Sequence, residues 1–298
     1  MPVLAHLSDP HLPLPRPRLS ELAGKRALGF LNWHRGRRHE HRFEILETIV
    51  RDLEANAPDH VAVTGDLVNI ALPGEFAPAL DFLARVGPPD RVTFVPGNHD
   101  TYVRATMEHS NRHWGEYMRG DDPADAPAGR FPFVRRRGAV ALVGLSTAAP
   151  TAPFMATGKL GPDQLRELGA RLAGLAAEGV FRVVLLHHPP APFEADRLRK
   201  LTDAAAFRQV LREHGAELVL HGHTHVHSLA WLDGPAGRIP AVGVPSASAS
   251  LAEDHERASY NLYRIEGRPG GWRCEAISRG LAAATGGVVE LGRQMLQG

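Results

Sequence analysis

The stretch "HVAVTGD" occupies residues 60–66, and its form decides the fold class. A short apolar run that ends abruptly in polar residues is typical of a buried parallel strand in an α/β protein. The same form recurs in five other stretches: "VLAHLSD" (3–9), "VTFVPGNHD" (92–100), "AVALVGLS" (139–146), "RVVLLHH" (182–188) and "ELVLHGH" (217–223). The chain is therefore expected to be an α/β protein.

Between these runs lie helical patterns, at residues 43–55, 75–85, 162–178 and 204–214. After residue 224 the pattern changes to "SLAWL", "RIPAVGVPS", "SYNLYRIEG" and "WRCEAIS", separated by Gly and Pro, which indicates further strands. We expect two sheets packed face to face with helices outside, in one domain over residues 1–280. Residues 281–298 begin rich in Ala and Gly, and we expect a loosely held helix or tail there.

Composition excludes several classes of protein. The chain has 298 residues, 43% of them hydrophobic, which is enough for a sizeable core. Lys and Arg number 34 against 33 Asp and Glu, so the overall charge gives no case for a nucleic-acid or membrane partner. The single cysteine, Cys274, excludes an intramolecular disulfide and a thiolate metal cage. The N-terminal residues meet charge and proline too soon for a secretory signal, and we expect a cytoplasmic protein.

Polar residues end five of the predicted strands. They form the motifs "DPH" (9–11), "GD" (65–66), "GNHD" (97–100), "HHPP" (187–190) and "GHTH" (222–225), and histidine is abundant, at 17 residues. In open α/β sheets ligands bind beyond the carboxyl ends of strands, so these side chains are candidates for one shared site. Taken singly, each motif is more often structural, but five of them in this order indicate a function.

These motifs resemble the signature of the calcineurin-like metallophosphoesterases, which reads Asp-x-His, Gly-Asp, Gly-Asn-His-Asp or Gly-Asn-His-Glu, a lone His and Gly-His-x-His. The resemblance spans Asp9 to His225. It implies a four-layer α/β/β/α sandwich in which two mixed β-sheets are flanked by helices. It also implies a centre of two divalent metal ions.

The family pattern implies the ligands. One ion takes Asp9, His11, Asp66 and His225, and the other takes Asp66, Asn98, His187 and His223. A carboxylate has two oxygens and suits the shared position of Asp66. Imidazole, carboxylate and amide donors without thiolate favour manganese, iron or zinc over calcium or magnesium. The alternate spacing of His223 and His225 is expected to place both imidazoles on one strand-like face.

The neighbouring histidines receive other roles. We expect His221 and His227 to support the site or lie at the surface, and Pro189 to turn His188 away from the ligand His187.

The implied chemistry is attack on phosphorus by a hydroxide that bridges two ions. At the position of His99 the family uses a general acid or a cation that stabilises the phosphate. We expect Asp100 to orient that imidazole and raise its pKa. A purely structural role for His99 is the alternative.

The motifs of this chain differ from those of some subgroups of the family, and these differences narrow the range of expected substrates. "GDLVN" and "GNHD" differ from the Ser/Thr protein phosphatases, and His99 stands where lipid A precursor pyrophosphatases commonly carry Arg. The motifs resemble most the bacterial class III cyclic-nucleotide phosphodiesterases and glycerophosphodiesterases. We therefore expect a small-molecule phosphodiester as substrate. A nucleotide-linked lipid pyrophosphatase is one alternative, and a non-catalytic metal-binding scaffold is another.

Residues 13–42 form a basic insertion, with eight Lys or Arg against Glu21 and Glu40. Leu19, Leu22, Phe30 and Trp33 are spaced loosely along one helical face. The segment is either a cap helix that packs on the domain with a solvated charged face, or a lid or interfacial helix that guides an anionic or lipid-linked phosphate ester to the metals and contacts a membrane peripherally. Within it, "HRGRRHEH" offers histidines that could bind stray metal, but a solvated basic loop is the preferred interpretation. No nucleic-acid partner is expected, and a homodimer is left open.

Overall fold

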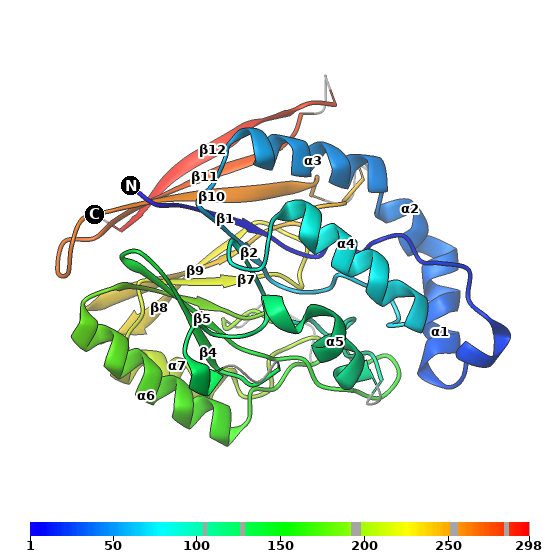
Figure 1. Ribbon diagram of the computed structural model, residues 1–298, viewed down its shortest axis with the longest axis horizontal. Coiled ribbons are helices and arrows are strands. Elements are labelled where there is room, and N and C mark those ends of the chain that lie inside the picture. Colours follow the sequence, from blue (N-terminus) through cyan, green and yellow to red (C-terminus); the bar gives the residue numbers. More distant parts are fainter. Residues whose placement is uncertain (104–105, 126–128, 192–197, 251–255, 283–285, 298) are drawn as a thin grey trace.

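The computed structural model describes residues 1–103, 106–125, 129–191, 198–250, 256–282 and 286–297 (Figure 1). Its first sheet has the order β12-β11-β10-β1-β2-β3, with β1, β2 and β3 parallel and the other neighbours antiparallel. The strands are β1 (Val3–Leu7), β2 (His60–Val63), β3 (Val92–Phe94), β10 (Ser259–Glu266), β11 (Arg273–Leu281) and β12 (Val288–Gln297).

The second sheet has the order β4-β5-β6-β7-β9-β8. Strands β5, β6, β7 and β9 are parallel, and β4 and β8 run antiparallel at the two edges. The strands are β4 (Phe133–Arg137), β5 (Val140–Gly144), β6 (Phe181–Leu185), β7 (Leu218–His221), β8 (Ser228–Gly234) and β9 (Gly237–Gly243).

Helices cover the outer faces of both sheets (Figure 1). On the first sheet lie α3 (Phe43–Ala55) and α4 (Phe76–Val86), and on the second lie α6 (Pro162–Glu178) and α7 (Ala204–His214). In α3 the apolar residues Leu46, Ile49, Val50 and Leu53 recur at helical spacing and are buried. The sequence pattern predicted these four helices within one residue of their observed ends.

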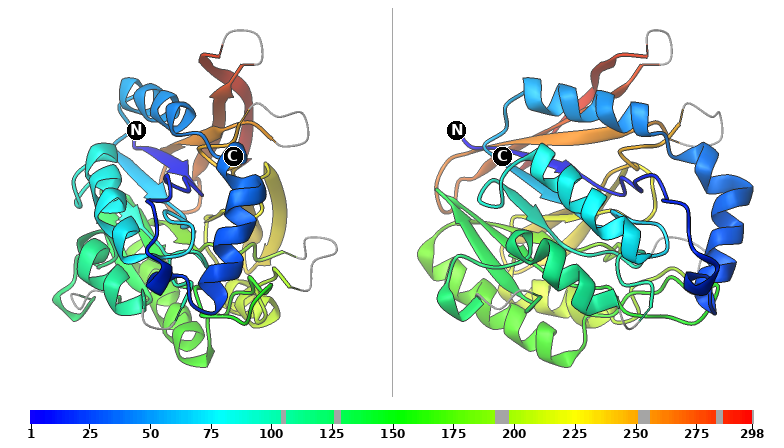
Figure 2. Two further views of the ribbon diagram at one scale, coloured as in Figure 1. Left: turned by 90° about the vertical axis from the view of Figure 1, so that its right-hand side faces the viewer. Right: turned by 45° about the vertical axis from the view of Figure 1, so that its right-hand side comes forward.

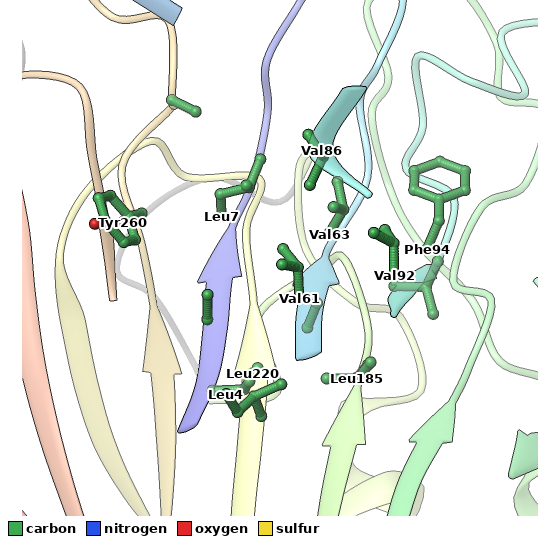
Figure 3. Close-up of a cluster of buried hydrophobic side chains, with 14 of the residues drawn as sticks. Leu4, Leu7, Val61, Val63, Val86, Val92, Phe94, Leu185, Leu220 and Tyr260 are labelled. Carbon is green, nitrogen blue, oxygen red and sulfur yellow. The ribbon is translucent and has the colours of Figure 1, made fainter. Parts of the chain in front are cut away.

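Successive side chains of a strand point to opposite faces of the second sheet, so the hydrophobic core has two parts. On β5, Val140 and Leu142 belong to the cluster that joins the two sheets, whereas Ala141 and Val143 belong to the cluster under α6 and α7. Figure 3 shows part of the first cluster, with Leu4 and Val61 from one sheet and Leu185 and Leu220 from the other. The expected fold, two mixed sheets flanked by helices, is confirmed.

The C-terminal segment corrects one expectation, because residues 288–297 form strand β12 and not a helix or tail. Gly286, at φ +64°, turns the chain after β11, and β12 then pairs antiparallel with β11 along nearly its whole length. The Ala- and Gly-rich stretch lies between β11 and β12, and residues 283–285 of it are outside the described residues. The side chains of this edge strand are mostly exposed, and backbone hydrogen bonds to β11 hold it in place. The strand therefore has no apolar pattern from which it could be predicted.

Strand β4 was also missed, since "FVRRR" reads as polar. Its Arg135 is buried because the guanidinium donates to backbone carbonyls, among them those of Arg119 and Val92. The stretch "RRRG" (135–138) reads from sequence as a hairpin turn, but its arginines belong to β4 and the turn to β5 begins at Gly138.

The basic insertion forms a short η1 (Leu19–Glu21), helix α1 (Lys25–Asn32), one π-helical segment η2 (Trp33–Arg37) and a turn α2 (Arg38–Glu40). Figures 1 and 2 show it standing at the end of the sandwich toward which β1 points. None of the described helices in the chain has the length and apolar character needed to cross a bilayer.

Candidate metal centre

All seven predicted ligands come from loops that follow strands at one end of the two sheets. Asp9 and His11 follow β1, Asp66 follows β2, Asn98 follows β3, His187 follows β6, and His223 and His225 follow β7. Parallel strands end at the same edge of a sheet, and the two sheets face each other, so residues far apart in sequence meet here.

A first group of donor atoms surrounds Asp9. The His225 Nε2 lies 3.1 Å from Asp9 Oδ1 and 3.3 Å from His11 Nε2. The His11 Nε2 is 3.9 Å from both Asp9 Oδ1 and Asp66 Oδ2. Ligands held about 2.1 Å from one ion are roughly 3–4 Å from each other, so this spacing suits a shared cation.

A second group surrounds His187. Its Nε2 lies 3.3 Å from Asp66 Oδ2, 3.3 Å from Asn98 Oδ1 and 3.2 Å from His223 Nδ1. The two groups therefore meet at one atom, Asp66 Oδ2. The structure brings all seven predicted residues into these two overlapping sets.

The backbone that carries these side chains is unusual. Asp9, His11, Asp66, His223 and His225 all have φ between +39° and +72°. Residues other than glycine adopt this region rarely, and such outliers collect at functional sites. Strand β7 ends at His221, so the strand-like face expected for His223 and His225 is wrong: left-handed backbone aims both rings at the site.

Hydrogen bonds to carbonyl oxygens set the imidazole tautomers. The Nδ1 of His11 lies 3.3 Å from the Val68 oxygen, and the Nδ1 of His187 lies 2.6 Å from the Thr64 oxygen. The Nε2 of His223 lies 2.9 Å from a carbonyl oxygen, that of Arg199. A carbonyl only accepts, so these nitrogens donate, and in the neutral form of each ring the lone pair is on the side of the cluster.

Burial and charge shift the pKa values of the cluster. Burial raises the pKa of Asp66, but the His187 and His99 rings outweigh it and hold the pKa below its ordinary value. Burial lowers the pKa of His187, but the carboxylates of Asp66 and Asp9 outweigh it and raise the pKa to about 10. Burial, with His188 beside it, keeps the pKa of His223 well below its usual range. Ionised carboxylates thus face imidazoles across a buried gap.

The chemistry of this donor set fits a pair of divalent cations. Two carboxylates, one amide oxygen and four imidazoles converge, and groups of three among them have ligand atoms within 4.8 Å of one another. Carboxylate, amide and imidazole donors without a thiolate suit borderline metals, and one carboxylate oxygen is common to both sets.

Comparison with known proteins identifies the family. A family model for calcineurin-like phosphoesterases matches residues 2–227. The chain belongs to this family. Phosphoesterases of this kind depend on metal, and the family binds two divalent ions, as the resemblance implied.

Solved structures share the fold. A dimetal phosphatase from Danio rerio is 13% identical, with a TM-score of 0.64 over 99% of this chain and 98% of that one. A purple acid phosphatase from yellow lupin (Lupinus luteus) seeds is 12% identical, with a TM-score of 0.57 over 99% and 53%. GAP50, the anchor in the inner membrane complex of Plasmodium, is 10% identical, with a TM-score of 0.50 over 99% and 88%. Among curated proteins no match was found.

Asp100 in this phosphoesterase binds backbone amides, whereas the sequence predicts that it orients the His99 ring. Its buried carboxylate accepts hydrogen bonds from the backbone N–H groups of Asp66, Leu67 and Gly97, at 2.8–2.9 Å. Asp100 therefore ties the Gly-Asp loop to the Gly-Asn-His-Asp loop. Burial and the nearby Asp66 raise its pKa to about 8.

The carbonyl oxygen of Asn69 orients the His99 ring, through a short contact to Nδ1. Tyr102 stacks on this ring, with the centroids 5.7 Å apart. Sequence spacing gave no signal for the Asn69 contact, because a backbone carbonyl has no residue signature. His99 itself lines the pocket beside the metal centre.

The remaining histidines agree with supporting roles. His188 is bonded at both nitrogens, to Thr147 Oγ1 at 2.7 Å and the Ala156 carbonyl at 3.0 Å, and its ring packs against His223. His221 is buried, which lowers its pKa to about 4. His227 lies 3.1 Å from Ser259 Oγ, outside the cluster.

A pocket of about 500 Å³ opens over the centre. One face of the insertion forms a wall of this pocket, through residues at helical spacing that include Lys25, Gly29 and Trp33. No residue of α1 is fully buried, but the helix packs on the domain, because Arg26 donates to the carbonyls of Ile70 and Ala71 and Gly29 lies against Ile70. The "HRGRRHEH" segment is not simply a solvated loop, since its last histidine, His41, lies 4.4 Å from His11 between ring centroids.

The loops that carry the predicted ligands pack closely, and a substitution at Gly222 tests this packing. A Cβ there would overlap the Ser8 hydroxyl and the Asp9 carboxylate. We expect Gly222→Ala to lower the free energy of unfolding, measured in urea, by about 1–3 kcal/mol. Gly174 on α6 has no atom within 4 Å of an added Cβ, so Gly174→Ala should leave stability equal or higher. Equal stability in the two variants would contradict the packing described here.

Proposed function

We propose that this chain hydrolyses a small phosphodiester of the cyclic-nucleotide or glycerophosphodiester type, using two divalent ions. The observation that carries the proposal is the pair of donor sets that share Asp66 Oδ2. By the family pattern, Asp9, His11, Asp66 and His225 would hold one ion. Asp66, Asn98, His187 and His223 would hold the other.

When bound, the ions supply activated water and neutralise charge at phosphorus. The side chains around them position the reacting groups. The backbone N–H of His99 donates to Asp66 Oδ1 at 2.8 Å, which leaves Oδ2 for the shared position. The same residue presents its imidazole to the pocket, where a protonated ring can give its proton to the departing alkoxide.

The charge of the pocket favours a diester over a monoester. Among the described lining residues outside the proposed ligands, the Lys, Arg, Asp and Glu side chains are Lys25, Arg199 and Glu40, which leave one net positive charge. A diester carries one negative charge and a monoester close to two, so one net positive charge beside the metal centre suits the diester. Trp33, Tyr102 and Phe154 also line the pocket and offer aromatic surface to a second ester group.

The direct test is hydrolysis of bis(p-nitrophenyl) phosphate with added Mn²⁺, followed by a panel of cyclic nucleotides, glycerophosphodiesters and p-nitrophenyl phosphate. The proposal expects turnover of the diesters, with kcat/KM above that for the monoester. Wild-type protein that holds two ions and turns over none of them would support the scaffold alternative. A preference for the monoester would contradict the diester assignment.

A second candidate is a pyrophosphatase acting on a nucleotide-linked lipid. Exposed apolar side chains favour it: Leu28 and Leu31 on α1 are 36% and 47% exposed, and Phe154 at the pocket is 74% exposed. Apolar residues beside cations on a surface helix suit the edge of a lipid layer.

Exchange of both leucines separates the two candidates. The double variant Leu28→Gln and Leu31→Gln leaves the metal centre untouched, because neither residue lines the pocket. If the substrate is lipid-linked, the variant should lose about 10-fold or more in kcat/KM on a lipid-linked pyrophosphate in vesicles, since each buried leucine contributes about 1.5–3 kcal/mol. It should keep wild-type activity on bis(p-nitrophenyl) phosphate. Unchanged activity on both substrates would remove this candidate.

A further inference from the structure

His41 lies among the predicted ligands, although the family signature has no histidine there. His11, His41 and His225 each offer a ligand nitrogen, and the three nitrogens lie within 4.8 Å of one another. The His41 ring centroid is 4.4 Å from that of His11 and 5.4 Å from that of His225. The residue comes from the end of the basic insertion, directly after α2.

Backbone hydrogen bonds on both sides fix the position of His41. The Arg42 N–H donates to the Ser248 carbonyl at 2.9 Å, and the Ser250 N–H donates to the Glu40 carbonyl at 2.7 Å. His41 thus forms an isolated antiparallel bridge with Ala249, in the segment that follows β9. The end of the insertion is attached to the body of the fold beside the metal centre.

Two serine hydroxyls lie beside Nδ1 of His41. The Ser246 hydroxyl donates its one proton to the carbonyl of Asp9, at 2.6 Å. Its oxygen, 3.2 Å from His41 Nδ1, can therefore only accept from that nitrogen, and Ser248 Oγ lies 2.9 Å from the same atom. Both serine oxygens can accept from Nδ1, and a proton held there leaves the lone pair on Nε2. Ligating histidines are held in this way, with the second nitrogen donating to a protein oxygen.

We infer that His41 is an additional ligand of the ion held by Asp9, His11, Asp66 and His225. The inference rests on the proposed dinuclear centre and adds a donor that the signature lacks. It gives the insertion a function at the metal: the segment that walls the pocket is joined to the ion through its last histidine. The competing interpretation is that the ring only packs against His11.

Two substitutions at His41 and one matched control distinguish these interpretations. His41→Asn keeps, at the Nδ1 position, a group that can donate a hydrogen bond to the serines. It removes Nε2, the nitrogen proposed to bind the ion. His41→Gln places an amide oxygen near the Nε2 position, where it can still coordinate weakly. His39→Asn is the control, since His39 is exposed in the same segment and bonded to Arg38.

The readouts are calorimetric titration with Zn²⁺, thermal unfolding, and the visible absorption of Co²⁺-loaded protein, which reports the number of ligands. We expect His41→Asn to bind one of two ions roughly 10- to 100-fold more weakly and to change the cobalt spectrum, with His41→Gln intermediate and His39→Asn unchanged. If His41→Asn does not fold, His41→Gln decides.

Two results lead to different conclusions. A wild-type protein that binds fewer than two ions would remove the dinuclear centre itself. Two ions in the wild type, with unchanged affinity and spectrum in the His41 variants, would leave that centre in place and overturn the role of His41.

Discussion

Asp66→Asn is expected to remove turnover of bis(p-nitrophenyl) phosphate almost completely. The amide oxygen can still accept the His99 N–H at the Oδ1 position, which the carboxylate does at 2.8 Å. An NH₂ group then replaces the shared oxygen, and it cannot coordinate. Since Oδ2 belongs to both donor sets, kcat/KM should fall by more than the roughly 10²–10³-fold that loss of one transition-state donor costs.

Metal content should change along with activity in this variant. Asp81 on α4 is exposed, so Asp81→Asn makes the same change of charge away from the site and should keep wild-type kcat/KM and two bound ions. Full activity of Asp66→Asn, or an equal loss in both variants, would refute the shared position of Asp66.

His99→Asn has the second largest expected effect, and the effect depends on the leaving group. A general acid matters when the departing oxygen needs a proton, so kcat/KM on a diester with an alkyl leaving group should fall by roughly 10²–10⁴-fold. The loss on bis(p-nitrophenyl) phosphate should be clearly smaller, because p-nitrophenolate leaves without a proton. The ratio of kcat/KM values for the two substrates is the measurement.

The smaller side chain is a suitable replacement, since an Asn amide can donate to the Asn69 carbonyl as Nδ1 does. His39→Asn is the matched exposed control. Equal losses on both substrates would show that His99 binds phosphate or holds the loop, and would argue against proton transfer.

The fold could be predicted from the sequence because its strands and helices follow simple periods. The run "HVAV" at β2 is buried throughout, and α3 repeats its apolar residues at helical spacing. The order of the motifs then placed seven polar residues at strand ends. Parallel strands end at one edge, so their meeting in one site followed from topology.

What could not be predicted depends on backbone geometry and long-range contacts. The left-handed φ of His223 and His225 leaves no pattern in the residues themselves. Asp100 binds backbone amides, and the Asn69 carbonyl binds His99, so neither interaction involves two recognisable side chains. His41 reaches the site through a bridge to Ala249, some 200 residues away in sequence, which a basic local composition concealed.

The central claim is that Asp66 joins two cation sites. Anomalous diffraction from crystals grown with Mn²⁺ tests it most directly. We predict two peaks roughly 3.5–4 Å apart, one on each side of the Asp66 carboxylate. A single peak, or two peaks that do not both contact Asp66, would contradict the account.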